Sequence, residues 1–352
     1  MKSKGLICAA IIFSICASCE NPKLKDGVQS TIGRGEMPNL SKDSHGNLHL
    51  VFGMGDSLMY STSSNAGLSF TKPELIALLP NLTAAHTRGP QIACINNGIV
   101  VTAANHQGDL FSFFKNEQGN WSGPVRITDT DTIAREQFLA LAAGDSIVFA
   151  VWLDLRLKHN AIFGAASTDG GRTWSKNKLI YDSPDGTVCE CCKPSLAMKG
   201  KTIYLMFRNW LGGSRDLYLM QSNDGGRNFG EARKLGEESW KLNGCPMDGG
   251  NLVLNENGEL QTVWLRKKTI YASVPGGRET AIGEGRACTI ESIMGRNVFA
   301  WTEKGNIVIS NEQGKRITLG EGIQPQIKAT SEGKLVCIWE NANQIQKAVV
   351  DL

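Results

Sequence analysis

The feature that most constrains this sequence is a strand–turn–strand unit that recurs along nearly its whole length. Each unit joins an apolar strand, which in most copies opens at or near a Pro, to a polar turn and a second apolar strand that in most copies ends in an aromatic residue. In one copy Pro194 precedes the apolar residues 203–207, and in another Pro325 precedes residues 335–339. The units begin at residues 38, 90, 137, 194, 246, 288 and 325. Self-similarity of this kind predicts a repeat architecture.

The spacing of the units, 37 to 57 residues, suits a four-stranded propeller blade. The last unit is too short for four strands, whereas residues 26–33, ahead of the first unit, have the character of a fourth strand. We therefore expect the amino-terminal segment to complete the last blade and close the ring, which removes exposed sheet edges. The predicted fold is all-β: a single β-propeller over residues 26–352, with seven four-stranded blades preferred over six.

Composition narrows the class of protein. The chain has 352 residues with 39 Gly, a net charge of +3 and no block of like charges, so a nucleic-acid partner is not expected. Ten Cys in a chain of this length exclude a small disulfide-stapled scaffold. The sequence has no P-loop, no dinucleotide-binding glycine motif, no His-Glu-x-x-His and no Gly-x-Ser-x-Gly.

The amino terminus has the pattern of a secretory signal: a basic start, a short apolar run and small residues before Cys19. It resembles a bacterial lipoprotein signal, with Cys16 where that pattern has Leu. This resemblance implies a signal peptide at 1–18, lipidation of Cys19 and a tether at 19–25; a cleaved signal without lipid is the alternative. We expect a monomer in the cell envelope, in the periplasm or at the cell surface, that contacts the membrane only through its lipid.

Three turns share the pattern Ser-x-Asp-x-Gly-x-x-aromatic, at 167–174, at 222–229 and, with Asn for Asp, at 63–70. The short acidic or amide side chain can accept backbone N–H groups inside the turn, and Gly allows a positive φ. The motif resembles the Asp-boxes (BNR repeats) of the sialidase superfamily. We expect these turns to stabilise hairpins and not to take part in catalysis.

In a propeller of four-stranded blades, the links between blades and the loops from the second to the third strand lie on one face, which we call the upper face. Ligand sites of propellers are expected there. Arginine side chains converging on the channel suit a planar anion such as the carboxylate of an acidic sugar; in the alternative they pair with acidic residues of neighbouring blades. The expected ligand-binding residues are Arg34, Arg88, Arg135, Arg156, Arg208, Arg286 and Asp248.

A comparison with true sialidases can be made in the third unit. Arg135 opens a first strand, Asp154 stands in an Asp-x-Arg after the second strand, and the Asp-box at Ser167 follows. The resemblance implies that Arg135 clamps a carboxylate and that Asp154 donates a proton; Glu136 and His106 are further catalytic candidates. This sequence departs from the family in three ways. Sialidases carry the Arg in a Phe-Arg-Ile-Pro motif, whose Ile-Pro is absent here, and they have six blades. No Tyr is identifiable as the nucleophile that retaining hydrolysis requires.

Two neighbouring inter-blade links carry the most distinctive residues, Cys189-Glu190-Cys191-Cys192 and Cys245-Pro246-Met247-Asp248. Three interpretations stay open. Cys245 forms a disulfide with one of the three cysteines, and Cys288 pairs with another; Cys191 and Cys192 form a vicinal disulfide; or the thiolates bind copper or zinc with Met247 nearby. Cys94 and Cys337 are expected to be buried thiols.

The leading hypothesis is therefore a sialidase-like, glycan-active lipoprotein without a cofactor, leaning to an exo-acting glycoside hydrolase specific for a terminal acidic sugar. The first alternative is a carbohydrate-binding surface lipoprotein without catalysis. The second is a propeller whose cysteines bind copper or zinc or have a structural role.

Overall fold

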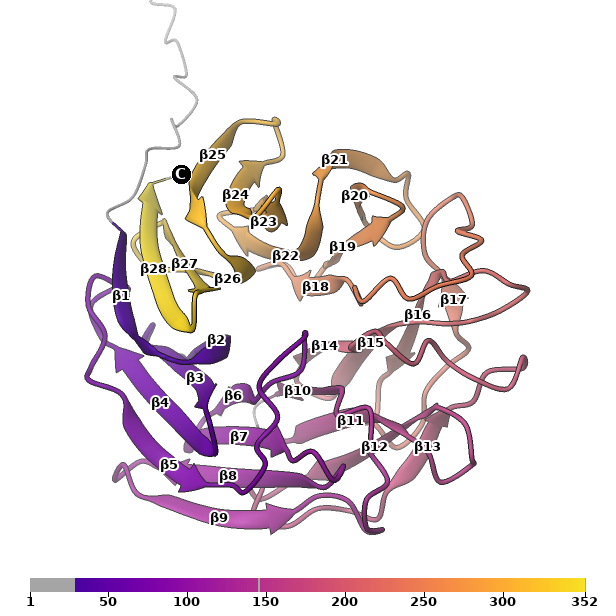
Figure 1. Cartoon of the computed structure of the whole chain (residues 1–352), viewed down its shortest axis with the longest axis horizontal. Coiled ribbons are helices and arrows are strands. Elements are labelled where there is room, and N and C mark those ends of the chain that lie inside the picture. Colours follow the sequence, from indigo (N-terminus) through magenta and orange to yellow (C-terminus); the bar gives the residue numbers. More distant parts are fainter. Residues whose placement is uncertain (1–28, 145, 352) are drawn as a thin grey trace, which may run out of the picture.

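The computed structural model describes residues 29–144 and 146–351, which form 28 strands. The strands make seven separate four-stranded antiparallel sheets, arranged around a ring (Figure 1). The predicted seven-bladed propeller is thereby confirmed. The predicted signal peptide, the tether and Cys19 lie outside the described residues. Within the described ranges, no helix is long and apolar enough to span a membrane.

The first three blades contain strands β2 to β13, and within each blade the strands follow one another from the channel outward. The first blade is β2 (Glu36–Lys42), β3 (Leu48–Met54), β4 (Ser57–Ser63) and β5 (Glu74–Leu78). The second is β6 (Gln91–Ile95), β7 (Gly98–Ala104), β8 (Leu110–Asn116) and β9 (Trp121–Arg126). The third is β10 (Leu139–Ala143), β11 (Val148–Asp154), β12 (Ala161–Ser167) and β13 (Lys178–Tyr181).

The next three blades repeat this order. The fourth is β14 (Ser195–Lys199), β15 (Thr202–Arg208), β16 (Leu217–Ser222) and β17 (Arg233–Lys234). The fifth is β18 (Asn251–Leu254), β19 (Leu260–Arg266), β20 (Thr269–Ser273) and β21 (Thr280–Glu284). The sixth is β22 (Arg286–Ile293), β23 (Arg296–Glu303), β24 (Asn306–Asn311) and β25 (Arg316–Glu321).

The seventh blade is built from both ends of the described chain. Its inner strands are β26 (Ile323–Ala329), β27 (Lys334–Asn341) and β28 (Gln344–Asp351), and its outer strand is β1 (Gln29–Arg34). Strand β1 pairs antiparallel with β28, from Gln29 opposite Ala348 to Arg34 opposite Gln344. Figure 1 shows the indigo β1 beside the yellow β28. The expected closure of the ring by the amino-terminal strand is confirmed.

The core lies between blades, because each sheet is covered on both sides by its neighbours. Strand β11 is buried along its whole length, and Trp152, Trp301 and Trp339 on second strands are at most 1% exposed. Apolar clusters join adjacent blades; in one of them Phe52 of the first blade packs with Ile338 of the seventh. Burial on both faces explains why the second strands are continuous apolar runs and do not alternate.

The three turns at 63–70, 167–174 and 222–229 join third to fourth strands and have the expected self-capped geometry. In the turn after β12, Asp169 Oδ1 accepts the N–H groups of Arg172 at 3.1 Å and Thr173 at 2.9 Å, and Ser167 Oγ donates to it at 2.8 Å. Gly171 has a φ of 81°, which Gly adopts without strain. These contacts give the turns a structural role.

Candidate functional site

In five of the seven blades, a residue other than Gly has a positive φ at or near the start of the inner strand, on the upper face. Met37, Gln137, Met247, Ala287 and Gln324 stand near these starts with φ between 51° and 55°. The pairing of inner and second strands shifts register at three of these places, in the first, sixth and seventh blades. A left-handed backbone is costly for residues other than Gly and is concentrated at functional sites. These left-handed residues therefore indicate the channel mouth as a candidate functional site.

A cavity of about 350 Å³ lies at this mouth, and we call it the mouth cavity. Four of the left-handed residues line it, and so does Thr87, which has a φ of 70°. Its ionisable side chains come from three blades, Glu36, Arg286 and Glu340, and from the link between the first and second blades, His86. Its apolar lining includes Met37, Ala84, Ala85, Met247 and Ile323. The cavity thus combines a few convergent polar groups with apolar surface, as ligand sites do.

Glu340 and Glu36 are the carboxylates of the mouth cavity. Glu340 Oε2 accepts the N–H of Met37 at 2.9 Å. Burial raises the pKa of Glu340 above its ordinary value, and the charge of Glu36 adds to that effect. Sequence reasoning missed both residues. A signal was available, because Glu340 follows Trp339 at the upper end of a second strand, the position that selected Asp154.

Asp154 lies at the end of β11 and is fully buried. Its Oδ2 accepts a hydrogen bond from Trp152 Nε1 at 2.8 Å, and Arg156 donates to both oxygens at 2.9 Å. Arg156 also donates to Asp129 and Asn177. A carboxylate without solvent contact, saturated by protein donors, has no free position for a substrate. The structure therefore gives Asp154 and Arg156 a structural role in place of the expected proton donor and anion clamp.

The expected convergence of arginines does not form. Arg208 is 2% exposed and donates to three main-chain carbonyls, those of Asp248 at 2.9 Å, Arg215 at 2.7 Å and Leu265 at 2.8 Å. It joins the fourth blade to the fifth, as a buried arginine with satisfied donors does. Of the expected arginines in the described chain, Arg286 alone lines the mouth cavity.

The remaining upper-face candidates of blades two and three lie outside the mouth cavity. Arg88 Nε donates to the main-chain carbonyl of Glu136 at 2.7 Å, and the guanidinium lies 4.1 Å from the ring centre of Phe138. The Glu136 carboxylate is 3.8 Å from Arg88 Nη2, and burial raises its pKa. Arg135 and His106 are exposed. Arg34, at the end of β1, is also exposed.

Asp248 is 5% exposed and has a structural role in the link before β18. Its carboxylate accepts the N–H groups of Gly250 at 3.1 Å and Ala287 at 2.8 Å. Burial raises its pKa, while the nearby positive charge of Arg208 opposes this rise. The carboxylate holds the fifth blade against the sixth, so it is not free to bind a ligand.

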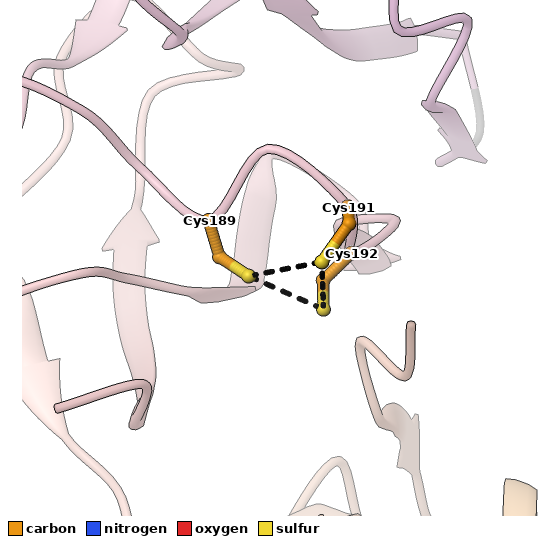
Figure 2. Close-up of side chains that lie close together, drawn as sticks. All are labelled: Cys189, Cys191 and Cys192. Atoms are coloured by element: carbon orange, nitrogen blue, oxygen red, sulfur yellow. Dashed lines mark hydrogen bonds between the residues drawn. The ribbon is translucent and has the colours of Figure 1, made fainter. Parts of the chain in front are cut away.

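The cysteines of the two distinctive links meet next to the mouth cavity. Cys191 and Cys245 form a disulfide, and the Sγ atoms of Cys189, Cys191 and Cys192 lie together (Figure 2). We call these four residues the cysteine cluster. Met247 packs against three of them and also lines the mouth cavity. The predicted disulfide between Cys245 and one of the three is confirmed.

Two other cysteine predictions are wrong. Cys191 and Cys192 do not form a vicinal disulfide, because their Sγ atoms are 4.0 Å apart. Cys288 is a free, buried thiol. Cys337 is buried as expected, whereas Cys94 is partly exposed and lines the central channel.

Two contacts hold the cysteine cluster in place. Arg215 Nη1 is 3.0 Å from Cys189 Sγ and also donates to Glu190. A hydrogen bond with Cys192 and the charge of Arg215 lower the pKa of the Cys189 thiol to about 7. A Cβ on Gly249 would lie 1.8 Å from the carbonyl oxygen of Lys193, so only Gly lets the two links touch.

No protein-family model matches the chain, and no curated protein matches it. Among solved structures, the BP39L lectin of Burkholderia pseudomallei is 12% identical with a TM-score of 0.62; the match covers 91% of this chain and 100% of the lectin. An α-L-arabinofuranosidase of Fusarium graminearum is 10% identical with a TM-score of 0.53, over 93% of this chain and 98% of the enzyme.

A virginiamycin B lyase of Staphylococcus aureus is 12% identical with a TM-score of 0.53, over 94% of this chain and 100% of the lyase. The NanB sialidase of Streptococcus pneumoniae is 11% identical with a TM-score of 0.45, over 93% of this chain and 70% of the sialidase. The likenesses to the lectin, the arabinofuranosidase and the lyase show the propeller fold, and that fold hosts both carbohydrate-related proteins and others.

Proposed function

We propose that the protein recognises a carbohydrate at the mouth cavity. The observation that carries this proposal is the lining of the cavity, in which Glu36, Glu340 and Arg286 lie beside the apolar side chains of Met37 and Met247. A sugar presents hydroxyl groups at its edge and C–H groups on its ring faces, so it needs such a mixture of partners. A volume of about 350 Å³ lies within the range of small-molecule sites.

The charges of the cavity favour a neutral sugar over the acidic sugar that the sequence suggested. Glu36 and Glu340 repel a carboxylate, and Arg286 is a single opposing cation. Hydroxyl groups of a neutral sugar can instead donate to the two glutamates and accept from Arg286. A lectin and a glycosidase among the similarly folded proteins are consistent with this class of ligand.

Calorimetric titration with a panel of neutral and acidic sugars tests the proposal. We expect neutral sugars to bind, and Glu340→Gln and Arg286→Ala to weaken binding about 10- to 100-fold, the effect of losing one charged hydrogen bond. Arg135→Ala is the control, since Arg135 is an exposed upper-face arginine outside the cavity. A panel without any binding, or equal losses in all three variants, would overturn the proposal.

Glycoside hydrolysis is the second candidate, and the pair of carboxylates in the mouth cavity favours it. The raised pKa of Glu340 suits a general acid, and Glu36 is the second carboxylate that glycosidases require. In this scheme Glu340 takes the role first expected for Asp154. Turnover of reporter glycosides that is lost in Glu340→Gln but kept in Glu136→Gln would support it, and no turnover across the panel would exclude it.

We also propose that Cys19 carries a lipid that holds the protein at a membrane surface. The small residues before Cys19 and the apolar run ahead of them support this proposal. Metabolic labelling with a fatty acid should mark the wild-type protein and not Cys19→Ser; equal labelling of both would contradict it.

A further inference from the structure

We propose that the cysteine cluster, in its thiol form, is a binding site for one thiophilic d¹⁰ cation, Cu⁺ or Zn²⁺. The carbohydrate proposal makes no use of these residues. Cys189, Cys191 and Cys192 come from one short turn at the upper ends of β14 and β15 and are at most 8% exposed. Three cysteine sulfur atoms buried in one place, two of them outside the disulfide, need a chemical explanation, because packing alone is served by ordinary apolar side chains.

The spacing of the sulfur atoms fits a single ion. The Sγ of Cys189 is 3.7 Å from that of Cys191 and 3.4 Å from that of Cys192, and the last two are 4.0 Å apart. Sulfur ligands about 2.3 Å from a tetrahedral metal ion stand about 3.8 Å from one another. The three atoms therefore already lie near three corners of such a tetrahedron, and Figure 2 shows them facing one another.

Two further sulfur atoms are available for the fourth corner. Cys245 stands in an exposed link and reaches Cys191, with which it forms the disulfide. Met247, two residues later, packs against the cluster with its thioether side chain. The disulfide and the metal ion use the same atoms, so they exclude one another, and the ion binds the form in which Cys191 and Cys245 are both thiols.

Two buried guanidinium groups offset part of the charge of such a site, and one of them, that of Arg215, also pairs with Glu190. Four thiolates around Zn²⁺, or three around Cu⁺, carry a net charge of −2. The Arg215 guanidinium is 3% exposed and lies 3.0 Å from Cys189 Sγ. Arg208 is buried behind it and donates to the carbonyl of Arg215. Cations placed next to the ligands stabilise a buried anionic complex.

The chemistry of the donors selects the class of metal. Every ligand offered by the cluster is sulfur, which favours Cu⁺ and Zn²⁺ and disfavours Mg²⁺ and Ca²⁺, which prefer oxygen. The ligands come from two inter-blade links, which touch each other where Gly249 of one link packs against Lys193 of the other. The site is thus assembled by the folded ring and not by the Cys-x-Cys-Cys segment alone.

The test is anaerobic titration of the reduced protein with Zn²⁺ or with Cu⁺, in competition with a chromophoric chelator, and with the bound metal measured by mass spectrometry. We expect one ion per chain, a rise in the melting temperature on loading, and at least a 100-fold loss of affinity in Cys189→Ser and Cys192→Ser. Cys94→Ser is the control, because Cys94 is a partly exposed thiol on the central channel.

The single substitution Cys245→Ser keeps the proposal testable if the buried variants fail to fold, since Cys245 is exposed. Because Zn²⁺ prefers four ligands, we expect Cys245→Ser to lower the affinity for Zn²⁺ at least tenfold. Reduced protein that binds neither ion stoichiometrically would overturn the proposal. Binding that Cys245→Ser, Cys192→Ser and Cys94→Ser all leave unchanged would overturn it as well.

Discussion

Replacing Arg208 by Met separates a structural role of this arginine from the ligand-binding role that the sequence suggested. Met has a similar length but no donors. In the protein Arg208 is buried and satisfies the carbonyls of Asp248, Arg215 and Leu265, which belong to three segments on the upper face. Arg208→Met leaves these three acceptors without their donor.

The expected loss follows from those three contacts. A buried polar group that loses its partner costs about 1–3 kcal/mol, so three carbonyls cost about 3–9 kcal/mol if no water replaces the guanidinium. Single domains have a free energy of unfolding of about 5–15 kcal/mol. Arg208→Met should therefore lose much of its stability, and Arg208→Lys, which keeps a cation with fewer donors, should fall between it and the wild type.

Urea unfolding followed by tryptophan fluorescence measures this effect, with Arg135→Met as the control because Arg135 is exposed. We expect the free energy of unfolding to fall by several kcal/mol for Arg208→Met and to change by no more than about 0.5 kcal/mol for Arg135→Met. The reasoning is refuted if Arg208→Met unfolds at the wild-type midpoint and instead loses sugar binding, since that result would assign Arg208 to the ligand.

Three further perturbations test the fold and its links. Hydrogen bonds from Asn228 lower the pKa of Asp224 to about 2. The ionised carboxylate therefore stabilises the folded state above pH 4, and this stabilisation is lost between pH 4 and pH 2. Over this interval the urea midpoint of Asp224→Asn should fall less than that of the wild type. Gly249→Ala should lower the free energy of unfolding by about 1–3 kcal/mol and reduce the yield of the Cys191–Cys245 disulfide in non-reducing peptide mapping. Gly230→Ala is the control, because a Cβ there meets no atom closer than 3.7 Å, and it should change neither quantity. Deleting β1 should lower the melting temperature and cause self-association on size exclusion, because β28 becomes an open edge; a monomer of unchanged stability would contradict the closure of the ring.

The fold was predictable because its signals are local and repeated. Each blade carries its own apolar strands and turns, so the spacing of units identified seven blades and the short last unit pointed to closure by the amino-terminal strand. The self-capped turns after the third strands are equally local, since Ser167, Asp169 and Thr173 hydrogen-bond within one turn.

The site was less predictable because it depends on which partner each side chain finds. Asp154 and Arg156 lie on the expected face, but Asp154 accepts hydrogen bonds from Arg156 and Trp152, and no spacing in the sequence reveals that pairing. Among the cysteines, the sequence limited the partner of Cys245 to three, and only the folded positions of the two links identify it as Cys191. Glu340 lies in the seventh blade, whereas the resemblance to sialidases places the expected carboxylate clamp and proton donor in the third.

A crystal structure of the protein with the sugar that binds most tightly in solution tests the central proposal most directly. We predict the sugar in the mouth cavity, within hydrogen-bond distance of Glu340 and Arg286 and with one ring face against Met37 or Met247. A sugar bound at the self-capped turns after the third strands or on the outer strands, with the mouth cavity free, would contradict the proposed function.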